Sequence, residues 1–244
     1  MAVDMLVGID LETTGVDPYK DEPVQMAAIC VRLAEGVAPT PKVLFNGYCN
    51  PSIPIQKEAE GVHGISLEMV RFSPTPKVSA KTMGMLVAVA EKTHNVYTVG
   101  YNSGAFDIPM IGRFDPRFYH HKHIDIYTLC LRELHTYGMK LSELYESYVG
   151  KEAVDAHDAA ADIFFTLEIA LKYLEDSNES VADLHKRLEI PRIYSVFPFG
   201  KYKGKAVEAV PASYAKWCLK NFNNITPDLQ ITLEHIAGGG FSGS

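Results

Sequence analysis

Two acidic side chains stand one residue apart in the sequence GIDLETTG (8–15), at Asp10 and Glu12. They end an apolar run that is typical of a buried strand. Because side chains alternate between the two faces of a strand, both carboxylates point to the same side. Like charges on one nearly buried face repel each other and lose hydration. The pattern therefore indicates a functional site, where a bound cation would remove the electrostatic conflict.

Two more acidic residues occur where later elements are expected to meet. Asp107 lies where a strand at 96–102 turns into a helix, and Asp162 lies in the strongest helical pattern of the chain, 156–176. Carboxylate oxygens are the ligands that Mg²⁺ prefers. Two such ions, roughly 4 Å apart, can clamp the attacking and leaving oxygens of a phosphodiester displacement. The acidic residues therefore favour a Mg²⁺ or Mn²⁺ site that acts on phosphodiesters.

One histidine, His157, precedes Asp162 by five residues. Five residues turn a helix through about 500°, so the two side chains converge only if His157 lies in the entering loop or the first turn. Asp155 or Asp158 as the N-cap of the helix would permit that. An imidazole titrates near neutral pH and can take the proton from the water that attacks phosphorus. His157 is therefore the candidate general base.

The remaining pattern predicts the elements that must hold these side chains. Apolar and β-branched runs indicate three early strands with short connections, which favours an antiparallel meander. Strands followed by alternating helices and strands indicate a mixed sheet covered by helices. The expected strands are 3–10, 24–33, 43–51, 96–102 and the start of 124–134, and the expected helices are 79–93, 104–113, the rest of 124–134, 141–149 and 156–176.

Four motifs carry a resemblance to a known family: GIDLETTG, EGVHGIS (60–66), YNSGAFD (101–107) and HDAAAD (157–162). In order and spacing they resemble the motifs of DEDDh 3′→5′ exonucleases, over roughly residues 3–174. The resemblance implies an α/β fold of the ribonuclease H-like type, with a mixed five-stranded sheet flanked by helices. It also implies that two Mg²⁺ (or Mn²⁺) ions bind Asp10, Glu12, Asp107 and Asp162, with His157 as general base.

Two details of the motifs qualify this resemblance. The sister DEDDy class carries a tyrosine four residues before the last aspartate, and this chain has Asp158 there, so the histidine class fits. The motif that ends at Asp107 is one residue longer than in the family, and Gly104 is expected to absorb the insertion as a bulged turn. The resemblance further implies substrate contacts at Leu11, Thr13, His63, Asn102 and Phe106.

Leu11 and His63 each have a second interpretation. Leu11 must point to the opposite face of its strand from both acids, so it can touch a substrate only where the strand ends. His63 fits a residue that packs its own loop as well as it fits a substrate contact.

After residue 176 the sequence becomes polar and less regular, and a compact segment follows. We therefore expect an exonuclease domain at 1–176, a linker with one short helix at 177–194, a small α+β module at 195–236 and a flexible tail at 237–244. The module resembles the C-terminal region of a small bacterial exodeoxyribonuclease of the same class. That resemblance is the reason to expect DNA as the substrate.

The segment FGKYKGKAV (199–207) alternates lysines with small and aromatic residues. Lysines supply salt-dependent affinity for phosphates, and aromatic rings stack on bases. Lys201, Lys203 and Lys205 are therefore candidate nucleic-acid contacts.

The alternative for this segment is a solvated hairpin whose Tyr202 packs on Trp217. Tyr214, Trp217 and Cys218 lie at helical spacing and are expected to form a small core.

Composition bears on other classes of protein. Hydrophobic content of 47% is ordinary for a soluble domain, and the net charge of −7 argues against a basic DNA-coating protein. The four cysteines form no C-x-x-C pair, so neither a disulfide framework nor a zinc ribbon is expected. His120, His121 and His123 lack further ligands at suitable spacing, so a solvated loop is preferred to a zinc site. No signal peptide or membrane-spanning run is evident, and a cytoplasmic protein is expected.

We therefore expect a metal-dependent 3′→5′ exodeoxyribonuclease that releases nucleoside 5′-monophosphates from DNA 3′ ends. An exoribonuclease of the same fold is the nearest alternative, because the preference for DNA rests only on the C-terminal resemblance. A nucleic-acid end-binding protein without catalysis is the alternative from another class. The longer YNSGAFD motif permits it, whereas the complete set of acids with His157 argues against it.

Overall fold

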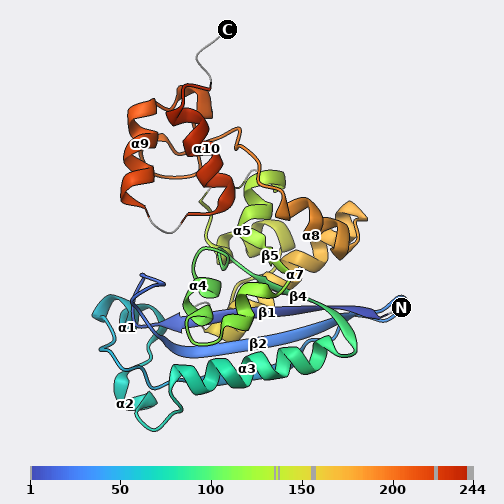
Figure 1. The fold of residues 1–244 in the computed structure, drawn as a ribbon. Coiled ribbons are helices and arrows are strands. Elements are labelled where there is room, and N and C mark those ends of the chain that lie inside the picture. The colour runs from blue at the N-terminus through green and yellow to red at the C-terminus, as the bar shows by residue number, and fades with distance from the viewer. Residues whose placement is uncertain (1, 135, 137, 155–157, 223–224, 241–244) are drawn as a thin grey trace.

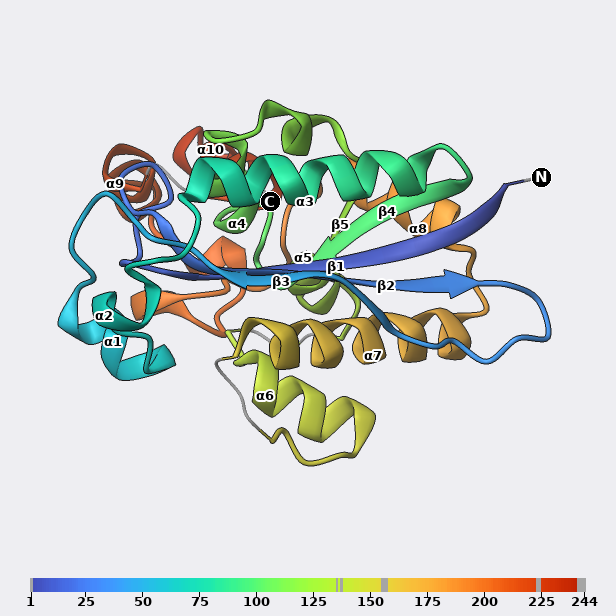
Figure 2. The same ribbon diagram turned by 90° about the horizontal axis from the view of Figure 1, so that it is seen from below.

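A mixed β-sheet forms the centre of the protein, with helices on both faces (Figures 1 and 2). The computed structural model describes residues 2–134, 136, 138–154, 158–222 and 225–240. Within these residues the sheet has five strands in the order β3-β2-β1-β4-β5. The strands are β1 (Val3–Thr13), β2 (Pro23–Leu33), β3 (Lys42–Tyr48), β4 (His94–Gly100) and β5 (His123–Asp125).

The first three strands form the expected antiparallel meander. β1 pairs antiparallel with β2, and β2 pairs antiparallel with β3, whereas β4 is parallel to both β1 and β5. β1 therefore occupies the middle of the sheet. It extends to Thr13, beyond the end expected at residue 10, and so carries both Asp10 and Glu12.

Helix α3 covers one face of the sheet and helix α7 covers the other (Figure 2). Short π-type turns follow α5 and α6 directly, over Cys130–Leu134 and Tyr145–Val149. The helices are α1 (Lys57–His63), α2 (Leu67–Val70), α3 (Pro76–Glu91), α4 (Asp107–Gly112), α5 (Ile126–Leu129), α6 (Leu141–Leu144), α7 (Ala159–Ser177), α8 (Val181–Glu189), α9 (Ala212–Asn221) and α10 (Pro227–Ala237).

Strand β1 alternates between two buried cores. Ile9 and Leu11 pack in the core that contains Met83 of α3. Leu6 packs in the core that contains Leu167 of α7. Successive side chains of a strand point to opposite faces, so the even-numbered residues of β1 face α7. The two acids of β1 are even-numbered and therefore lie on the α7 side.

The C-terminal segment contains a third core, and its helices α9 and α10 form the lobe at the top of Figure 1. Phe197, Cys218 and Leu233 are completely buried there. Leu131, from the turn after α5, packs in the same core. Helix α8 lies in the segment expected as a linker, and its Leu184 packs in the core on the α7 side of the sheet. The division into domains stays a prediction.

Trp217 does not join the third core, contrary to the expectation for α9. Tyr214 and Cys218 pack in that core, but 51% of the Trp217 surface is exposed. Successive residues are about 100° apart around a helix, so Trp217 lies to one side of the face that carries Cys218. The Tyr202 ring packs on Tyr214, at 4.8 Å between centroids. In the alternative of a solvated hairpin, Tyr202 was to pack on Trp217 instead.

A buried ion pair joins the C-terminal lobe to the rest of the protein. Nε and Nη2 of Arg132 donate to the two carboxylate oxygens of Asp228, at 2.6 and 2.5 Å. These side chains are 3% and 2% exposed. Nη1 donates to the carbonyl oxygen of Arg187 and Nη2 to that of Ile190, each at 3.0 Å. One guanidinium therefore binds the start of α10 and the chain around the end of α8.

All four cysteines are buried and free. Among the described residues, no helix combines the length and the apolar character that a membrane span requires.

Candidate active site

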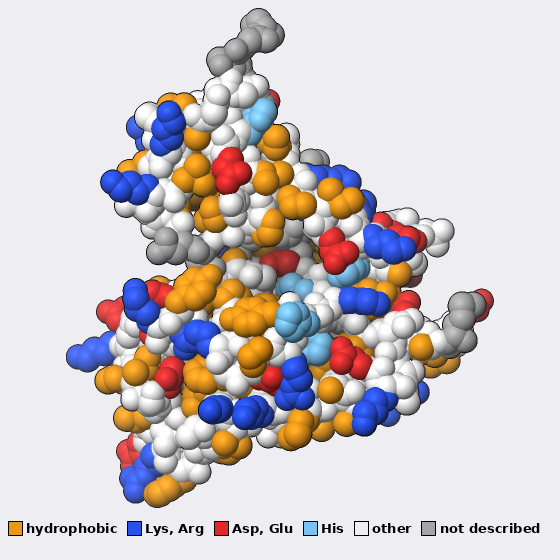
Figure 3. Space-filling view, in the orientation of Figure 1, with side chains coloured by type: hydrophobic (Ala, Val, Ile, Leu, Met, Phe, Trp, Pro, Cys, Tyr) orange, Lys and Arg blue, Asp and Glu red, His pale blue; other side chains and the backbone are white. Residues whose placement is uncertain are grey.

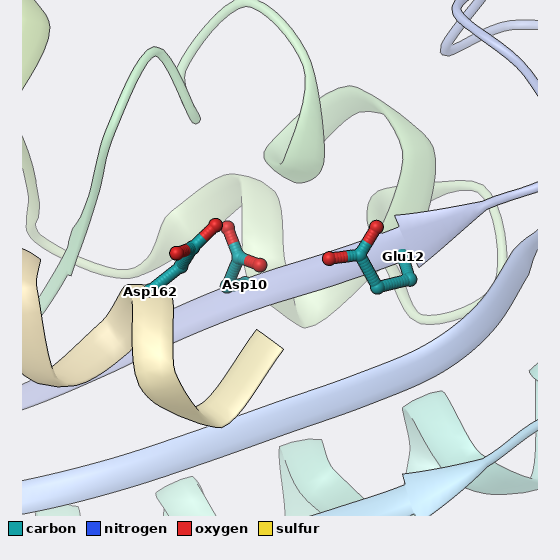
Figure 4. A group of neighbouring side chains, drawn as sticks. All are labelled: Asp10, Glu12 and Asp162. Atoms are coloured by element: carbon teal, nitrogen blue, oxygen red, sulfur yellow. The ribbon is translucent and has the colours of Figure 1, made fainter. Parts of the chain in front are cut away.

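Three carboxylates converge where the end of β1 lies beside the start of α7. Asp10, Glu12 and Asp162 each offer an oxygen atom, and these oxygens lie within 4.8 Å of one another. Figure 4 shows the carboxylates of Asp162 and Asp10 turned towards each other, with the Glu12 carboxylate pointing back along β1 towards them. All three side chains are partly buried. This arrangement of oxygen atoms suits a hard divalent cation.

Gly8 allows β1 and α7 to approach each other closely. A Cβ atom at position 8 would stand 2.4 Å from Cγ2 of Ile163 and 3.1 Å from Cγ of Leu167. Position 8 lies on the same face as Asp10, and Ile163 follows Asp162 directly. The missing side chain therefore permits the spacing between the acids of the two elements. No role was predicted for Gly8 from the sequence, although it lies two residues before Asp10 on the same face of the strand.

Asp107 stands outside this group of three but close to it. It is the first residue of α4 and is only 4% exposed. The backbone N–H of Leu11 donates to its carboxylate, which ties α4 to β1. Its negative charge is the first of the neighbouring charges that raise the pKa of Asp10. The structure therefore brings three of the four expected acids together and places the fourth, Asp107, beside them at the start of α4.

Burial and neighbouring negative charges raise the pKa values of these acids. Burial is the main cause of a pKa well above the ordinary value for Asp10, with the charges of Asp107 and Asp162 adding to it. Burial likewise raises the pKa of Glu12 to about 8 and that of Asp107 to about 8. Among the described lysines and arginines, none forms an ion pair with Asp10, Glu12 or Asp107. A divalent cation therefore fits the donor set.

His157, the expected general base, lies outside the described residues, as does Asp155. The next residue, Asp158, is the N-cap of α7 and accepts hydrogen bonds from the backbone N–H groups of Ala160 and Ala161, at 3.0 and 3.1 Å. The side-chain amide of Gln25 donates to its other carboxylate oxygen at 3.2 Å. The capping proposed for Asp158 is confirmed, and the catalytic role of His157 stays a prediction.

Asp125 organises the loop that contains the one-residue insertion. Its carboxylate accepts hydrogen bonds from the backbone N–H groups of Asn102 and Gly104, both at 3.0 Å. Asn102 has the left-handed conformation, with φ 56°, and its side chain is exposed. The left-handed residue of the inserted loop is thus Asn102, whereas Gly104 was expected to form the bulged turn. A Cβ atom at Gly104 would stand 3.2 Å from the Asp125 carboxylate, so the glycine allows this close approach.

The expected substrate residues near the end of β1 make contacts within the protein. Leu11 is 7% exposed and packs on the α3 side, so its side chain points away from the three carboxylates, as its position in the strand predicted. The Thr13 hydroxyl donates to the carbonyl oxygen of Gly15 at 2.7 Å. The pairing of β1 with β2 is irregular between Glu12 and Thr13. A substrate contact by either Leu11 or Thr13 stays a prediction.

His63 and Phe106 also make contacts within the protein. His63 Nδ1 accepts from the Ile65 backbone N–H at 2.9 Å, which leaves Nε2 to donate to the Thr13 carbonyl oxygen at 3.1 Å. Burial lowers the His63 pKa, which favours this neutral form. Phe106 precedes α4 and packs against the core on the α3 side. The loop-packing interpretation of His63 matches these bonds, and its contact with a substrate stays a prediction.

The histidines near β5 have separate partners. His123 contacts the Thr98 hydroxyl through Nδ1, at 3.0 Å, and the Ser103 hydroxyl through Nε2, at 2.9 Å. His121 contacts Glu91 through Nδ1, at 2.8 Å. Within the described part of the chain, the acidic trio is the group that can hold a metal ion.

The three candidate lysines of the C-terminal lobe differ in their surroundings. Lys203 Nζ donates to the carbonyl oxygen of Gly138 at 3.3 Å, which connects the lobe to the segment before α6. Lys201 Nζ lies 5.5 Å from the centre of the Tyr202 ring. Lys205 is exposed. Their contact with nucleic acid stays a prediction.

Comparison with known proteins finds similarity to exonucleases. The sequence matches the model of the exonuclease family named for RNase T over residues 7–170. It is 33% identical to exodeoxyribonuclease 10 of Escherichia coli K12 over 85 residues, which are 32% of this chain and 37% of the relative. It is 30% identical to oligoribonuclease of Coxiella burnetii over 137 residues, which are 52% of this chain and 72% of the relative. The chain thus matches little more than a third of exodeoxyribonuclease 10.

Solved structures of exonuclease I share the fold. The complex of E. coli exonuclease I with a dT13 oligonucleotide has a TM-score of 0.57 at 22% identity, covering 78% of this chain and 46% of that chain. Exonuclease I of Methylocaldum szegediense has a TM-score of 0.58 at 22% identity, covering 78% and 44%. The expected fold class, a mixed five-stranded sheet flanked by helices, is therefore confirmed.

Proposed function

The chain belongs to the RNase T family of exonucleases, and from this premise we propose that it is a metal-dependent 3′→5′ exodeoxyribonuclease. It removes nucleotides one at a time from the 3′ end of DNA and releases nucleoside 5′-monophosphates. The convergence of Asp10, Glu12 and Asp162 from two separate elements is the observation that carries this proposal. Their raised pKa values follow from burial and mutual repulsion, which a divalent cation would relieve.

Each residue of the site has a role in the proposal. Asp10, Glu12 and Asp162 hold the metal ions, and Asp107 completes the acidic set. Two Mg²⁺ or Mn²⁺ ions, when bound, supply positive charge for the attacking and leaving oxygens of the phosphodiester. His157 takes the proton from the attacking water. Backbone and side-chain groups near Leu11 and Thr13 seat the terminal nucleotide.

The substrate is proposed to be DNA because the sequence of the C-terminal segment resembles that of a DNA exonuclease and because exodeoxyribonuclease 10 is among the relatives. The likeness to oligoribonuclease makes an exoribonuclease the second candidate. Single-stranded DNA and RNA oligonucleotides of the same base sequence separate the two. We expect faster shortening of the DNA; equal or faster shortening of the RNA would transfer the proposal to RNA.

The enzymatic activity itself is tested with a 5′-labelled oligonucleotide in Mg²⁺, Mn²⁺ or EDTA. A ladder that shortens from the 3′ end in metal and is absent in EDTA is the expected result. Asp162→Asn serves as the control, because it keeps the shape of the side chain but removes its charge. Binding of the oligonucleotide without degradation in either metal would support the end-binding alternative and refute the enzyme.

The role of His157 is tested by His157→Ala. We expect DNA and metal binding to persist, because the residue is not among the proposed metal ligands. The single-turnover rate should fall by roughly 10²–10⁴, the usual contribution of a general base. An unchanged rate would remove His157 from that role.

A further inference from the structure

Two aromatic side chains at the C-terminal end of α9 are exposed to solvent. Trp217 is 51% exposed and Phe222 is 36% exposed. Their rings meet at 84°, with centroids 5.4 Å apart. We call Trp217 and Phe222 together the aromatic surface. Because the two rings adjoin, they form a continuous apolar patch, and exposed patches of this kind often mark a binding site.

Other rings pack against the aromatic surface on the side of the lobe's core. Tyr214 stacks on Trp217 at an interplanar angle of 22°, and Phe199 contacts Phe222 at 5.6 Å. Both supporting rings contact Phe197, which is completely buried. The chain of contacts therefore anchors the exposed rings to the core of the lobe. Rings that are held in place before binding lose little conformational entropy when a partner stacks on them.

Gly200 of the FGKYKGK segment contributes to this support. Its φ of 61° lies in the left-handed region, and a Cβ atom there would stand 2.7 Å from the Tyr214 hydroxyl oxygen. A glycine at this position therefore allows both the turn and the close approach of Tyr214. The segment that carries Lys201, Lys203 and Lys205 thus also positions the ring on which Trp217 stacks.

The segment that carries the aromatic surface differs in charge from the whole protein. Residues 195–222 contain five lysines and one acidic residue, Glu208, whereas the chain carries a net charge of −7. Lys216 and Lys220 lie on α9 beside Trp217 and are exposed. Exposed rings next to lysines are complementary to a single-stranded nucleic acid, whose bases stack and whose phosphates are negative.

Phe222 of the aromatic surface lies across a hollow from the loop that follows β1. An open cavity of about 440 Å³ is lined by Phe222 on one side and by Val16 and Tyr19 on the other. This loop continues β1 beyond Glu12. Val16 and Tyr19 are themselves 85% and 53% exposed. Figure 3 shows a gap between the C-terminal lobe and the rest of the molecule, with apolar side chains along its lower edge.

We propose that the aromatic surface and the facing loop bind the single strand of nucleic acid that leads to the 3′ end. Bases stack on Trp217, Phe222 and Tyr19, and the lysines of α9 bind the phosphates. The acidic residue in the hollow, Asp17, is paired with Lys20 at 2.7 Å, so its charge is balanced. The proposal rests on the exonuclease function, because it assigns a path to the substrate of that site.

The tryptophan provides a direct measurement, since Trp217 is the only tryptophan in the chain. An oligothymidylate is titrated into the full-length protein in EDTA, where a metal-dependent exonuclease does not degrade it. We expect saturable quenching of the fluorescence, which weakens as salt is added. The proposal would be overturned if heparin, which has negative charge but no bases, quenched the fluorescence and oligothymidylate did not. It would also be overturned if anisotropy detected oligothymidylate binding without any quenching.

Variants test the stacking itself. Trp217→Ala should weaken oligothymidylate binding by roughly 5- to 150-fold, from about 1–3 kcal/mol for one stacked base. Trp217→Phe should restore most of the affinity, because it keeps a ring. Phe72→Ala is the matched control, since Phe72 is 87% exposed but follows α2, far from α9 in Figure 1. Equal affinity of Trp217→Ala and the wild type would overturn the proposal.

The two proposals can fail separately. Hydrolysis of a p-nitrophenyl ester of thymidine 5′-monophosphate needs the acidic site but not a longer strand. We expect Trp217→Ala to hydrolyse this ester at the wild-type rate while it degrades long oligonucleotides less efficiently. Loss of ester hydrolysis in this variant would show that Trp217 acts on the catalytic site, and would overturn the strand-binding role. A wild type that degrades nothing but shows quenching would refute the exonuclease alone.

Discussion

The buried ion pair between Arg132 and Asp228 makes a quantitative prediction about how the C-terminal lobe is held. Arg132→Met leaves the Asp228 carboxylate buried without its partner and deprives the carbonyl oxygens of Arg187 and Ile190 of a donor. Removal of one partner from a buried pair costs about 3–5 kcal/mol, because an uncompensated charge remains in a region of low dielectric constant. At about 2–4 °C per kcal/mol for a chain of this length, Tm should fall by about 6–20 °C.

A double-mutant cycle isolates the ion pair from the packing of its stems. Asp228→Leu should cost a comparable amount for the same reason. The double variant Arg132→Met/Asp228→Leu buries no charge at this position, and apolar replacements of buried pairs are often nearly neutral. We therefore expect the double variant to be more stable than the sum of the single changes by about 2 kcal/mol or more.

Two probes show where the loss occurs. Trp217 is the only tryptophan and lies in the C-terminal lobe, so its fluorescence reports on the lobe, whereas far-ultraviolet circular dichroism reports on the whole chain. In urea, Arg132→Met should lower the fluorescence midpoint more than the dichroism midpoint. Single changes that cost less than about 1 kcal/mol, or a cycle that is additive within about 0.5 kcal/mol, would refute the assignment of the pair as the link.

Three further predictions concern the acidic site. Gly8→Ala should displace α7, which lowers stability by about 1–3 kcal/mol and the nuclease rate by roughly 10²-fold. Adding Ile163→Ala to this variant should restore part of both, and thermal unfolding and oligonucleotide assays measure the two effects. Asp10→Asn should raise Tm in EDTA, because it removes a charge whose pKa is raised by burial and like charges, and should abolish the Tm increase on addition of Mn²⁺. The raised pKa values of Glu12 and Asp107, each about 8, mean that the folded metal-free protein binds more protons than the unfolded chain. Its stability should therefore rise as the pH falls from about 8 towards 4.5, by at most about 1.4 kcal/mol for each pH unit and each proton bound. A Tm that decreases when the pH is lowered from 8 to 6 in EDTA would contradict this.

Much of the fold could be predicted from the sequence because its signals are local. The period-two and helical patterns place β1, β2 and α7 within a few residues of their observed bounds. The alternation of the strand also predicted that Leu11 points away from the two acids of β1. The burial of Trp217 was predicted wrongly, because helical spacing defines a face but not what covers it. Only the packing of the lobe shows that α9 leaves this residue at the surface.

The sequence by itself determined the chemical character of the site. It specified carboxylates at the end of one strand and at the start of one helix, and motifs in the order of a nuclease family. Tertiary structure alone decided which groups meet. Asp10, Glu12 and Asp162 converge because Gly8 lets α7 approach β1, and the backbone N–H of Leu11 holds Asp107 beside them. The reason is physical. The sequence itself states the type of each residue, and short-range sterics and hydrophobic patterning determine its local conformation. Distances between remote segments depend instead on how side chains pack across the core.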